Sequence, residues 1–176
     1  MKNSIDSEKI LILDFGSQYT QLIARRVREI GVFSEIVSHQ ISYKDILKYN
    51  PKGIILSGGP ESVYTKKILR IDSKILESNI PILGICYGMQ LIAQHFKGKV
   101  KTSNKSEFGA TKVKLNKGKI FKKILSKELN AWMSHGDKVT KLPKGFKRVA
   151  FSSNCSIAAI ENQKQKIYGL QFHPEV

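Results

Sequence analysis

Three short apolar runs constrain the fold of this chain most strongly. They are Lys9–Phe15, Gly53–Leu56 and Ile80–Ile85. A glycine-containing segment follows each of the first two runs, and a glycine lies within the third. Near-continuous apolar strands are typical of parallel sheets that are covered on both faces, because the side chains on both faces of each strand are then buried. Phe33–Ser38 adds a further short strand. The first half therefore predicts a buried, mostly parallel sheet.

The segments between these runs have helical periodicity. Tyr19, Ile23 and Val27 fall on one stripe, and Gly31 is a typical helix stop. A second stripe begins at Leu91. Alternation of strands and helices predicts right-handed crossovers between parallel strands. We expect an α/β fold with helices on both faces of the central sheet.

The second half of the chain has a different pattern. Its strand candidates are shorter and partly alternating, namely 110–115, 131–133, 148–151, 157–160 and 167–171. Such segments favour an additional antiparallel portion. No linker, repeat or low-complexity tract interrupts the sequence, so we expect one domain over residues 1–176. The chain ends abruptly at Val176, and we expect that further sequence follows there in the natural protein.

Charge and cysteine content narrow the class of protein. The 30 basic and 14 acidic residues give a net charge of +16. The lysines are scattered and no nucleic-acid motif is present, so we expect a solvated basic surface and no nucleic-acid partner. No apolar stretch is long enough for a membrane span, and the first nine residues carry no signal-peptide core. Two cysteines make no disulfide framework, which favours the cytoplasm.

The sharpest local motif surrounds Cys86. Gly84-Ile85-Cys86-Tyr87-Gly88 lies where a buried strand ends and a helix begins, which is the nucleophile-elbow pattern with cysteine in place of serine. A helix starting at Tyr87 directs its positive end at the thiol and lowers the pKa of that thiol. A buried cysteine between two packing glycines would explain these five residues equally well.

A second motif ends the chain. The proline after His173 favours an extended backbone, in which His173 and Glu175 project from the same side. A carboxylate on one imidazole nitrogen orients the ring, so that the other nitrogen can serve a thiol. Without a nucleophile elsewhere, a surface histidine beside an acid would be the simpler interpretation. The Cys86 elbow favours a Cys–His–Glu triad.

A third motif, Ser57-Gly58-Gly59-Pro60-Glu61, follows another buried strand. Its glycines free the backbone to direct N–H groups at a ligand, as an oxyanion hole requires. Ser-Gly-Gly also begins the phosphate loop of ATP pyrophosphatases, but the Asp-Ser that completes that loop is missing here. No metal-ligand spacing relates His39, His95, His135 and Cys155, and we expect no metal.

Together these motifs resemble the class I, triad-type glutamine amidotransferases. The likeness extends from about Lys9 to Val176 and includes two further segments, 13–19 and 132–137. The resemblance implies a flavodoxin-like fold and L-glutamine as substrate. It implies that Cys86 is the nucleophile, that His173 transfers protons and that Glu175 orients His173. Backbone N–H groups of Gly59 and Tyr87 would form the oxyanion hole, and the substrate contacts would be Gly58, Gln90, Gly136 and Asp137.

The two further segments indicate the branch of the family whose ammonia passes to a separate ATP-pyrophosphatase domain. The resemblance implies that ATP and Mg are needed by that partner and that no cofactor is needed by this domain. It also implies a homodimeric full enzyme. Two alternatives remain: an amidotransferase for another acceptor, in carbamoyl-phosphate, anthranilate or aminodeoxychorismate synthesis, or a non-catalytic regulatory module on the same fold.

Overall fold

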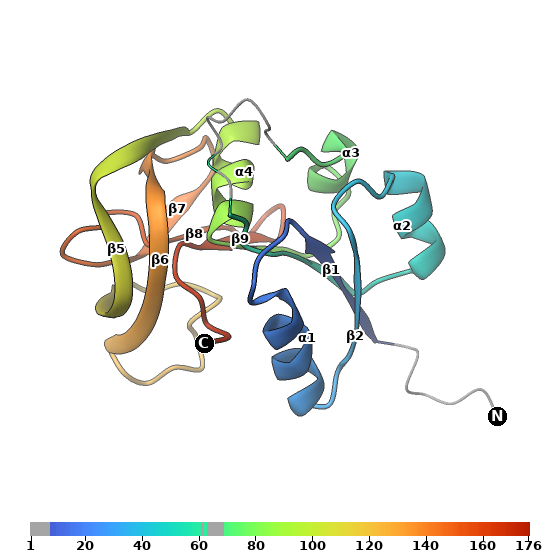
Figure 1. The fold of residues 1–176 in the computed structure, drawn as a ribbon, viewed down its shortest axis with the longest axis horizontal. Helices are drawn as coiled ribbons and strands as arrows, with labels where there is room; N and C mark the ends of the chain where they lie inside the picture. The colour runs from blue at the N-terminus through green and yellow to red at the C-terminus, as the bar shows by residue number, and fades with distance from the viewer. Residues whose placement is uncertain (1–7, 61, 63–68) are drawn as a thin grey trace.

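The computed structural model describes residues 8–60, 62 and 69–176. Figure 1 shows their arrangement. In chain order the elements are β1 (Lys9–Asp14), α1 (Thr20–Glu29), β2 (Phe33–Ser38), α2 (Tyr43–Tyr49), β3 (Gly53–Leu56), α3 (Ser73–Leu76), β4 (Ile82–Ile85), α4 (Tyr87–His95), β5 (Lys99–Leu115), β6 (Glu128–Lys141), β7 (Lys147–Phe151), β8 (Ala159–Asn162) and β9 (Ile167–Leu170).

The strands form one sheet with the order β2-β1-β3-β4-β9-β8-β7-β5-β6. Strands β2, β1, β3, β4 and β9 are parallel. From β9 onward the neighbours run antiparallel. The predicted division into a parallel and an antiparallel portion is therefore confirmed. Strand β9 belongs to both portions, which places the end of the chain directly beside β4.

Helices cover both faces of the parallel portion, as predicted. On one face, Leu11 and Leu56 share a core with Ile46 of α2 and Met89 of α4. Ile12 points to the other face and packs in a separate core that includes α1. Figure 1 shows α1 and α4 on opposite sides of the sheet. The alternation of side chains along each strand thus explains the near-continuous apolar runs of the sequence.

Strands β5 and β6 are much longer than the sequence pattern predicts. They pair from Lys99 opposite Lys141 to Lys114 opposite Glu128. In β6, alternate residues from Ala131 to Val139 are buried, but His135 and Asp137 are two of them. Polar residues at inward positions interrupt the apolar alternation by which a strand is recognised.

The sequence pattern also does not predict the short helix α2. The first turn of this helix is capped by Ser42, whose side chain accepts a hydrogen bond from the Asp45 N–H.

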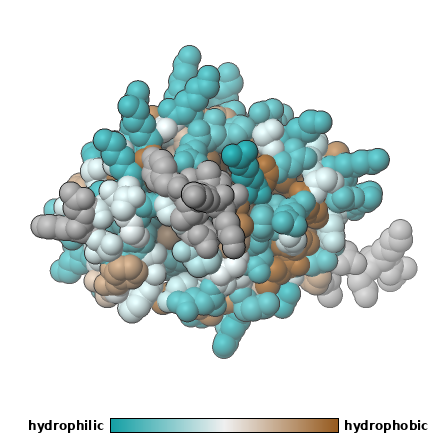
Figure 2. Space-filling model, turned by 45° about the horizontal axis from the view of Figure 1, so that its top comes forward, coloured by the Kyte–Doolittle hydropathy of each residue, from teal (hydrophilic) through white to brown (hydrophobic). Residues whose placement is uncertain are grey.

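Hydrophilic residues cover most of the face shown in Figure 2. Among the described residues, none of the helices has the length and apolar character needed to cross a membrane. Glu61, the last residue of the predicted turn motif after β3, lies outside the described residues.

Candidate active site

Cys86 lies on a strained turn between β4 and α4. Its backbone has φ +51° and ψ −103°, a conformation that side-chain-bearing residues rarely adopt. A Cβ added at Gly84 would come within 2.5 Å of the Gly88 backbone, and one added at Gly88 would come within 2.5 Å of the Leu56 carbonyl oxygen. Both glycines of the predicted elbow are therefore required by close backbone approach. Helix α4 begins immediately after Cys86, so the positive end of its dipole faces the thiol.

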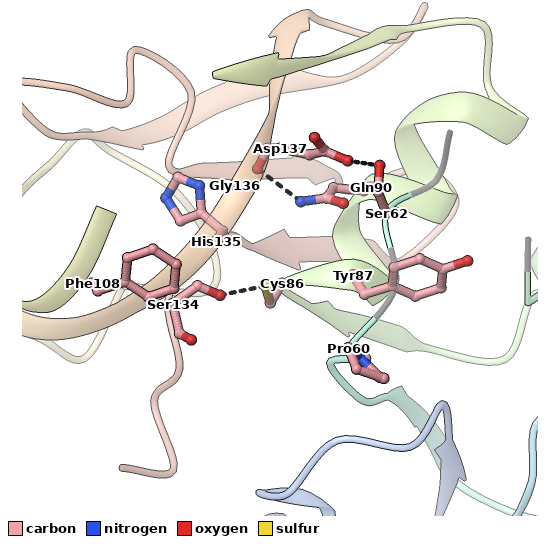
Figure 3. Close-up of a pocket in the computed structure, with 11 residues that line it drawn as sticks. Pro60, Ser62, Cys86, Tyr87, Gln90, Phe108, Ser134, His135, Gly136 and Asp137 are labelled. Carbon is pink, nitrogen blue, oxygen red and sulfur yellow. Dashed lines mark hydrogen bonds between the residues drawn. The ribbon is translucent and has the colours of Figure 1, made fainter. Parts of the chain in front are cut away.

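Two groups contact the thiol from β6 and from the segment after β9. The Cys86 Sγ lies 3.6 Å from the Ser134 carbonyl oxygen, to which it donates (Figure 3). The Gln171 amide donates to Sγ at 3.6 Å and is fully buried. Gln171 was not singled out as a candidate from the sequence. It precedes His173 by two residues in an extended segment, and that spacing was the signal that could have identified it.

His173 and Glu175 are paired as the sequence predicts. Their Nδ1 and Oε1 atoms are 2.7 Å apart, and both residues are buried. Burial by itself lowers the pKa of the His173 imidazole, but the side chains of Cys86 and Glu175 together raise that pKa to about 9. The imidazole is therefore protonated near neutral pH, and its Nδ1 atom faces the Glu175 carboxylate.

Several contacts hold this end of the chain against the rest of the site. The backbone N–H of His173 donates to the Trp132 carbonyl at 2.8 Å. The Tyr19 ring meets the imidazole edge-on, with ring centroids 5.1 Å apart. From α1, the Arg26 side chain donates to the Glu175 carbonyl at 3.1 Å. Residues from α1, β6 and the β1–α1 loop thus fix the histidine opposite the elbow.

The glycine turn after β3 lies beside both Cys86 and His173. Gly59 lines a cavity of about 290 Å³ that holds Cys86 and Tyr87, and also an adjoining cavity of about 240 Å³ that holds His173. Gly58 lines neither cavity; a Cβ built on it would lie 3.1 Å from His173 Cε1. Gly58 therefore packs on the histidine, and its predicted contact with the substrate stays a prediction.

The larger cavity brings together most of the other predicted substrate residues (Figure 3). The Gln90 amide donates to the Asp137 carbonyl at 2.9 Å, which joins α4 to β6. The Asp137 carboxylate accepts a hydrogen bond from Ser62. The cavity is lined by Gly59, Pro60, Ser62, Cys86, Tyr87, Gln90, Phe108, Ser134, His135, Gly136 and Asp137.

A separate polar cluster lies where β5 and β6 pair, beside the larger cavity. Glu107 stands opposite His135, with their Oε2 and Nε2 atoms 3.2 Å apart, and the Cys155 sulfur lies within 4.8 Å of ligand atoms of both residues. Burial lowers the pKa of His135, whereas burial and the Glu107 carboxylate raise the pKa of the Cys155 thiol to about 12. Sequence spacing did not reveal this group. Carboxylate, imidazole and thiol are groups that zinc can bind, and the expectation of no metal stays a prediction.

Comparisons with known proteins support the family that the sequence motifs resemble. The model of the glutamine amidotransferase class-I family matches residues 11–176. The chain is 51% identical over 176 residues to a GMP synthase [glutamine-hydrolyzing] from Macrococcus caseolyticus, and 53% identical over 177 residues to one from Bacillus cereus. Both alignments cover 100% of this chain and 34% of the relative, so the chain spans about a third of the length of these curated proteins.

Solved structures agree with the sequence comparisons. A Thermoplasma acidophilum protein, described as a GMP synthase subunit, has a TM-score of 0.83 and 34% identity, with 96% of this chain and 85% of that chain covered. A Thermotoga maritima glutamine amidotransferase shares the fold, with a TM-score of 0.77, 23% identity and coverage of 96% and 76%. The chain therefore belongs to the class-I glutamine amidotransferase family.

Proposed function

We propose that this chain is the glutaminase of a GMP synthase. In this proposal it hydrolyses L-glutamine to glutamate and ammonia, and the ammonia aminates XMP to GMP in a partner ATP-pyrophosphatase domain. The observation that carries the glutaminase is the strained Cys86 elbow beside the buried His173–Glu175 pair. The names of the relatives that are 51% to 53% identical support GMP as the product.

Hydrolysis begins with attack of the Cys86 thiolate on the side-chain carbonyl carbon of glutamine. The protonated His173 is the acid that gives its proton to the leaving nitrogen, so ammonia departs and a γ-glutamyl thioester remains. His173 then takes a proton from water, which attacks the thioester carbonyl. Glutamate leaves and the Cys86 sulfur is released. Glu175 keeps the imidazole oriented through both proton transfers.

Charge develops on the substrate oxygen in both tetrahedral intermediates. The N–H groups of Gly59 and Tyr87 are the proposed donors, because both residues line the cavity into which Cys86 opens. The α-amino and α-carboxyl groups of glutamine would be held by the surface formed by Gln90, Gly136 and Asp137. The Gln90–Asp137 hydrogen bond keeps that surface in place.

Each of these curated relatives has about two thirds of its length outside the part that this chain matches. That additional length supports a partner for this domain. We propose that a synthetase domain receives the ammonia and that ATP and Mg belong to that domain. A homodimeric full enzyme in the cytoplasm is part of the same proposal. The regulatory-module alternative lacks support, because a binding module has no need of an activated cysteine beside an oriented histidine.

Replacement of the two cysteines tests the proposal. Cys86→Ala should abolish glutamine hydrolysis and labelling by glutamine-like electrophiles, since the nucleophile is removed. The matched control is Cys155→Ala, which should leave both nearly intact because that thiol is fully buried and its pKa is raised to about 12. Hydrolysis that survives Cys86→Ala would contradict the mechanism.

The acceptor is tested with the same variant. Supplied with a synthetase domain, ATP and XMP, the Cys86→Ala chain should support GMP formation from free ammonia but not from glutamine. If the ammonia from this chain aminated a different acceptor and did not aminate XMP, the glutaminase proposal would stand. The assignment to GMP synthesis would be refuted.

A further inference from the structure

Ser57 is the last residue before the glycine turn, and its hydroxyl is engaged on both sides. It accepts a hydrogen bond from the Phe15 backbone N–H at 3.0 Å and donates to the Gly58 carbonyl oxygen at 2.8 Å. The Ser57 backbone N–H donates to the Leu13 carbonyl at 3.1 Å, and the residue is fully buried. Because a hydroxyl has a single hydrogen, the bond from Phe15 leaves that hydrogen for the Gly58 carbonyl.

The orientation of one peptide follows from this contact. In a trans peptide the carbonyl and the next N–H point in opposite directions, so a Gly58 carbonyl held against Ser57 turns the Gly59 N–H away from Ser57. Ser57 is buried against the end of β1, whereas Gly59 lines both cavities of the site. With the Gly58 carbonyl on the Ser57 side, the Gly59 N–H is left on the opposite side of the peptide, in the residue that lines both cavities.

Nothing in the covalent structure of the turn fixes that orientation. A peptide between two glycines rotates at low cost, because neither residue has a Cβ to restrict it. We infer that Ser57 is a positioning residue for the oxyanion hole: it ties the Gly58 carbonyl to β1 and thereby keeps the Gly59 N–H available to the developing oxyanion. This inference rests on the proposed glutaminase function.

The test is Ser57→Ala in this chain, assayed with a synthetase domain, ATP and XMP. One ordinary hydrogen bond biases the two peptide orientations, so kcat for glutamine should fall roughly five- to tenfold. Complete loss of one oxyanion donor, which costs on the order of 10²–10³, sets the upper limit. Binding of γ-glutamyl aldehyde should weaken by the same factor, since its adduct with Cys86 carries an oxyanion.

Two readouts separate positioning from general damage to the fold. KM for glutamine and the rate of Cys86 alkylation by iodoacetamide should not change, because neither requires an oxyanion. Ser34→Ala is the matched control: Ser34 is also fully buried, and its hydroxyl donates to the Ala24 carbonyl at 3.1 Å. Neither residue lines the two cavities of the site. Ser34→Ala should lower stability without changing kcat. Ser57→Thr, which keeps the hydroxyl, should retain more activity than Ser57→Ala.

Three results would overturn the inference. They are an unchanged or increased kcat in Ser57→Ala, a loss of alkylation rate in parallel with kcat, and an equal loss in Ser34→Ala. None of these would affect the proposed function, which stands or falls with Cys86→Ala.

Discussion

At the scale of single residues, the two cysteines show how position decides chemistry. Both are buried, with exposed fractions of 5% for Cys86 and 0% for Cys155. Cys86 follows a parallel strand, precedes a helix and faces an imidazole, whereas Cys155 donates to the Ile157 carbonyl and lies near a carboxylate. Burial and the neighbouring Glu107 carboxylate raise the pKa of the Cys155 thiol. The same side chain is therefore proposed as a nucleophile at one position and is a neutral thiol at the other.

Glu175→Gln tests the proposed role of Glu175 in orienting His173. Loss of the carboxylate removes one of the groups that raise the pKa of His173, so the basic limb of the kcat/KM profile should move to lower pH. Activity at neutral pH should fall about 10²-fold, at the lower end of the 10²–10⁴ that acid–base catalysis contributes. The measurement is a pH–rate profile for glutamine hydrolysis.

The control for Glu175→Gln is Glu35→Gln, which removes a carboxylate on β2 that pairs with Lys9 at 3.5 Å. It should leave the profile unchanged. An unshifted basic limb in Glu175→Gln would contradict the orienting role.

At the scale of elements, the site depends on how closely α4 approaches the sheet. Gly84 and Gly88 let the first turn of α4 meet the ends of β3 and β4, with backbone atoms where side chains would normally stand. Strand β9 pairs in parallel with β4, with Leu170 opposite Ile85. The Cys86 N–H donates to the Leu170 carbonyl at 2.7 Å, so this pairing places the elbow and the histidine segment side by side.

Gly88→Ala should destabilise the fold by about 1–3 kcal/mol, because the new methyl group would lie 2.5 Å from the Leu56 carbonyl oxygen and the helix would have to shift. Urea unfolding of wild type and variant gives this difference in the free energy of unfolding. Gly136→Ala is the control for stability, since its nearest contact would be 3.7 Å away and its backbone has no positive φ. Equal stability of the two variants would show that α4 tolerates the displacement.

At the scale of the whole molecule, the buried His173–Glu175 pair makes stability depend on pH. The pKa of His173 is about 9 in the folded state against an ordinary value of 6.5, so the folded chain holds this proton more tightly than the unfolded chain. The resulting stabilisation is fully present below pH 6.5 and is lost as the pH rises through 9. The pKa of Glu161 is lowered from 4.5, so it titrates well below this window. His135, whose pKa is lowered from 6.5, gives the opposite dependence, mainly below pH 6.5. Cys155, with an unfolded value of 9.0, adds a loss of the same sign near the upper end of the window.

The free energy of unfolding should therefore decrease between pH 6.5 and 9. Denaturant titrations at several pH values measure the slope, and His173→Gln should flatten it because the titrating group is gone. A variant slope as steep as that of wild type would mean that another group carries the dependence.

The sequence by itself determined the parallel strands, the division into two portions and the triad candidates. Each of these rests on local physics: apolar runs require burial on both faces, an elbow requires glycines, and an extended His-Pro-Glu segment places two side chains on one side. Tertiary structure alone decided that β9 lies beside β4, that β6 buries His135 and Asp137, and that Glu107 and Cys155 meet His135. It also decided that Ser57 holds the Gly58 carbonyl. These contacts join segments distant in sequence or depend on one peptide orientation, and no local pattern encodes either.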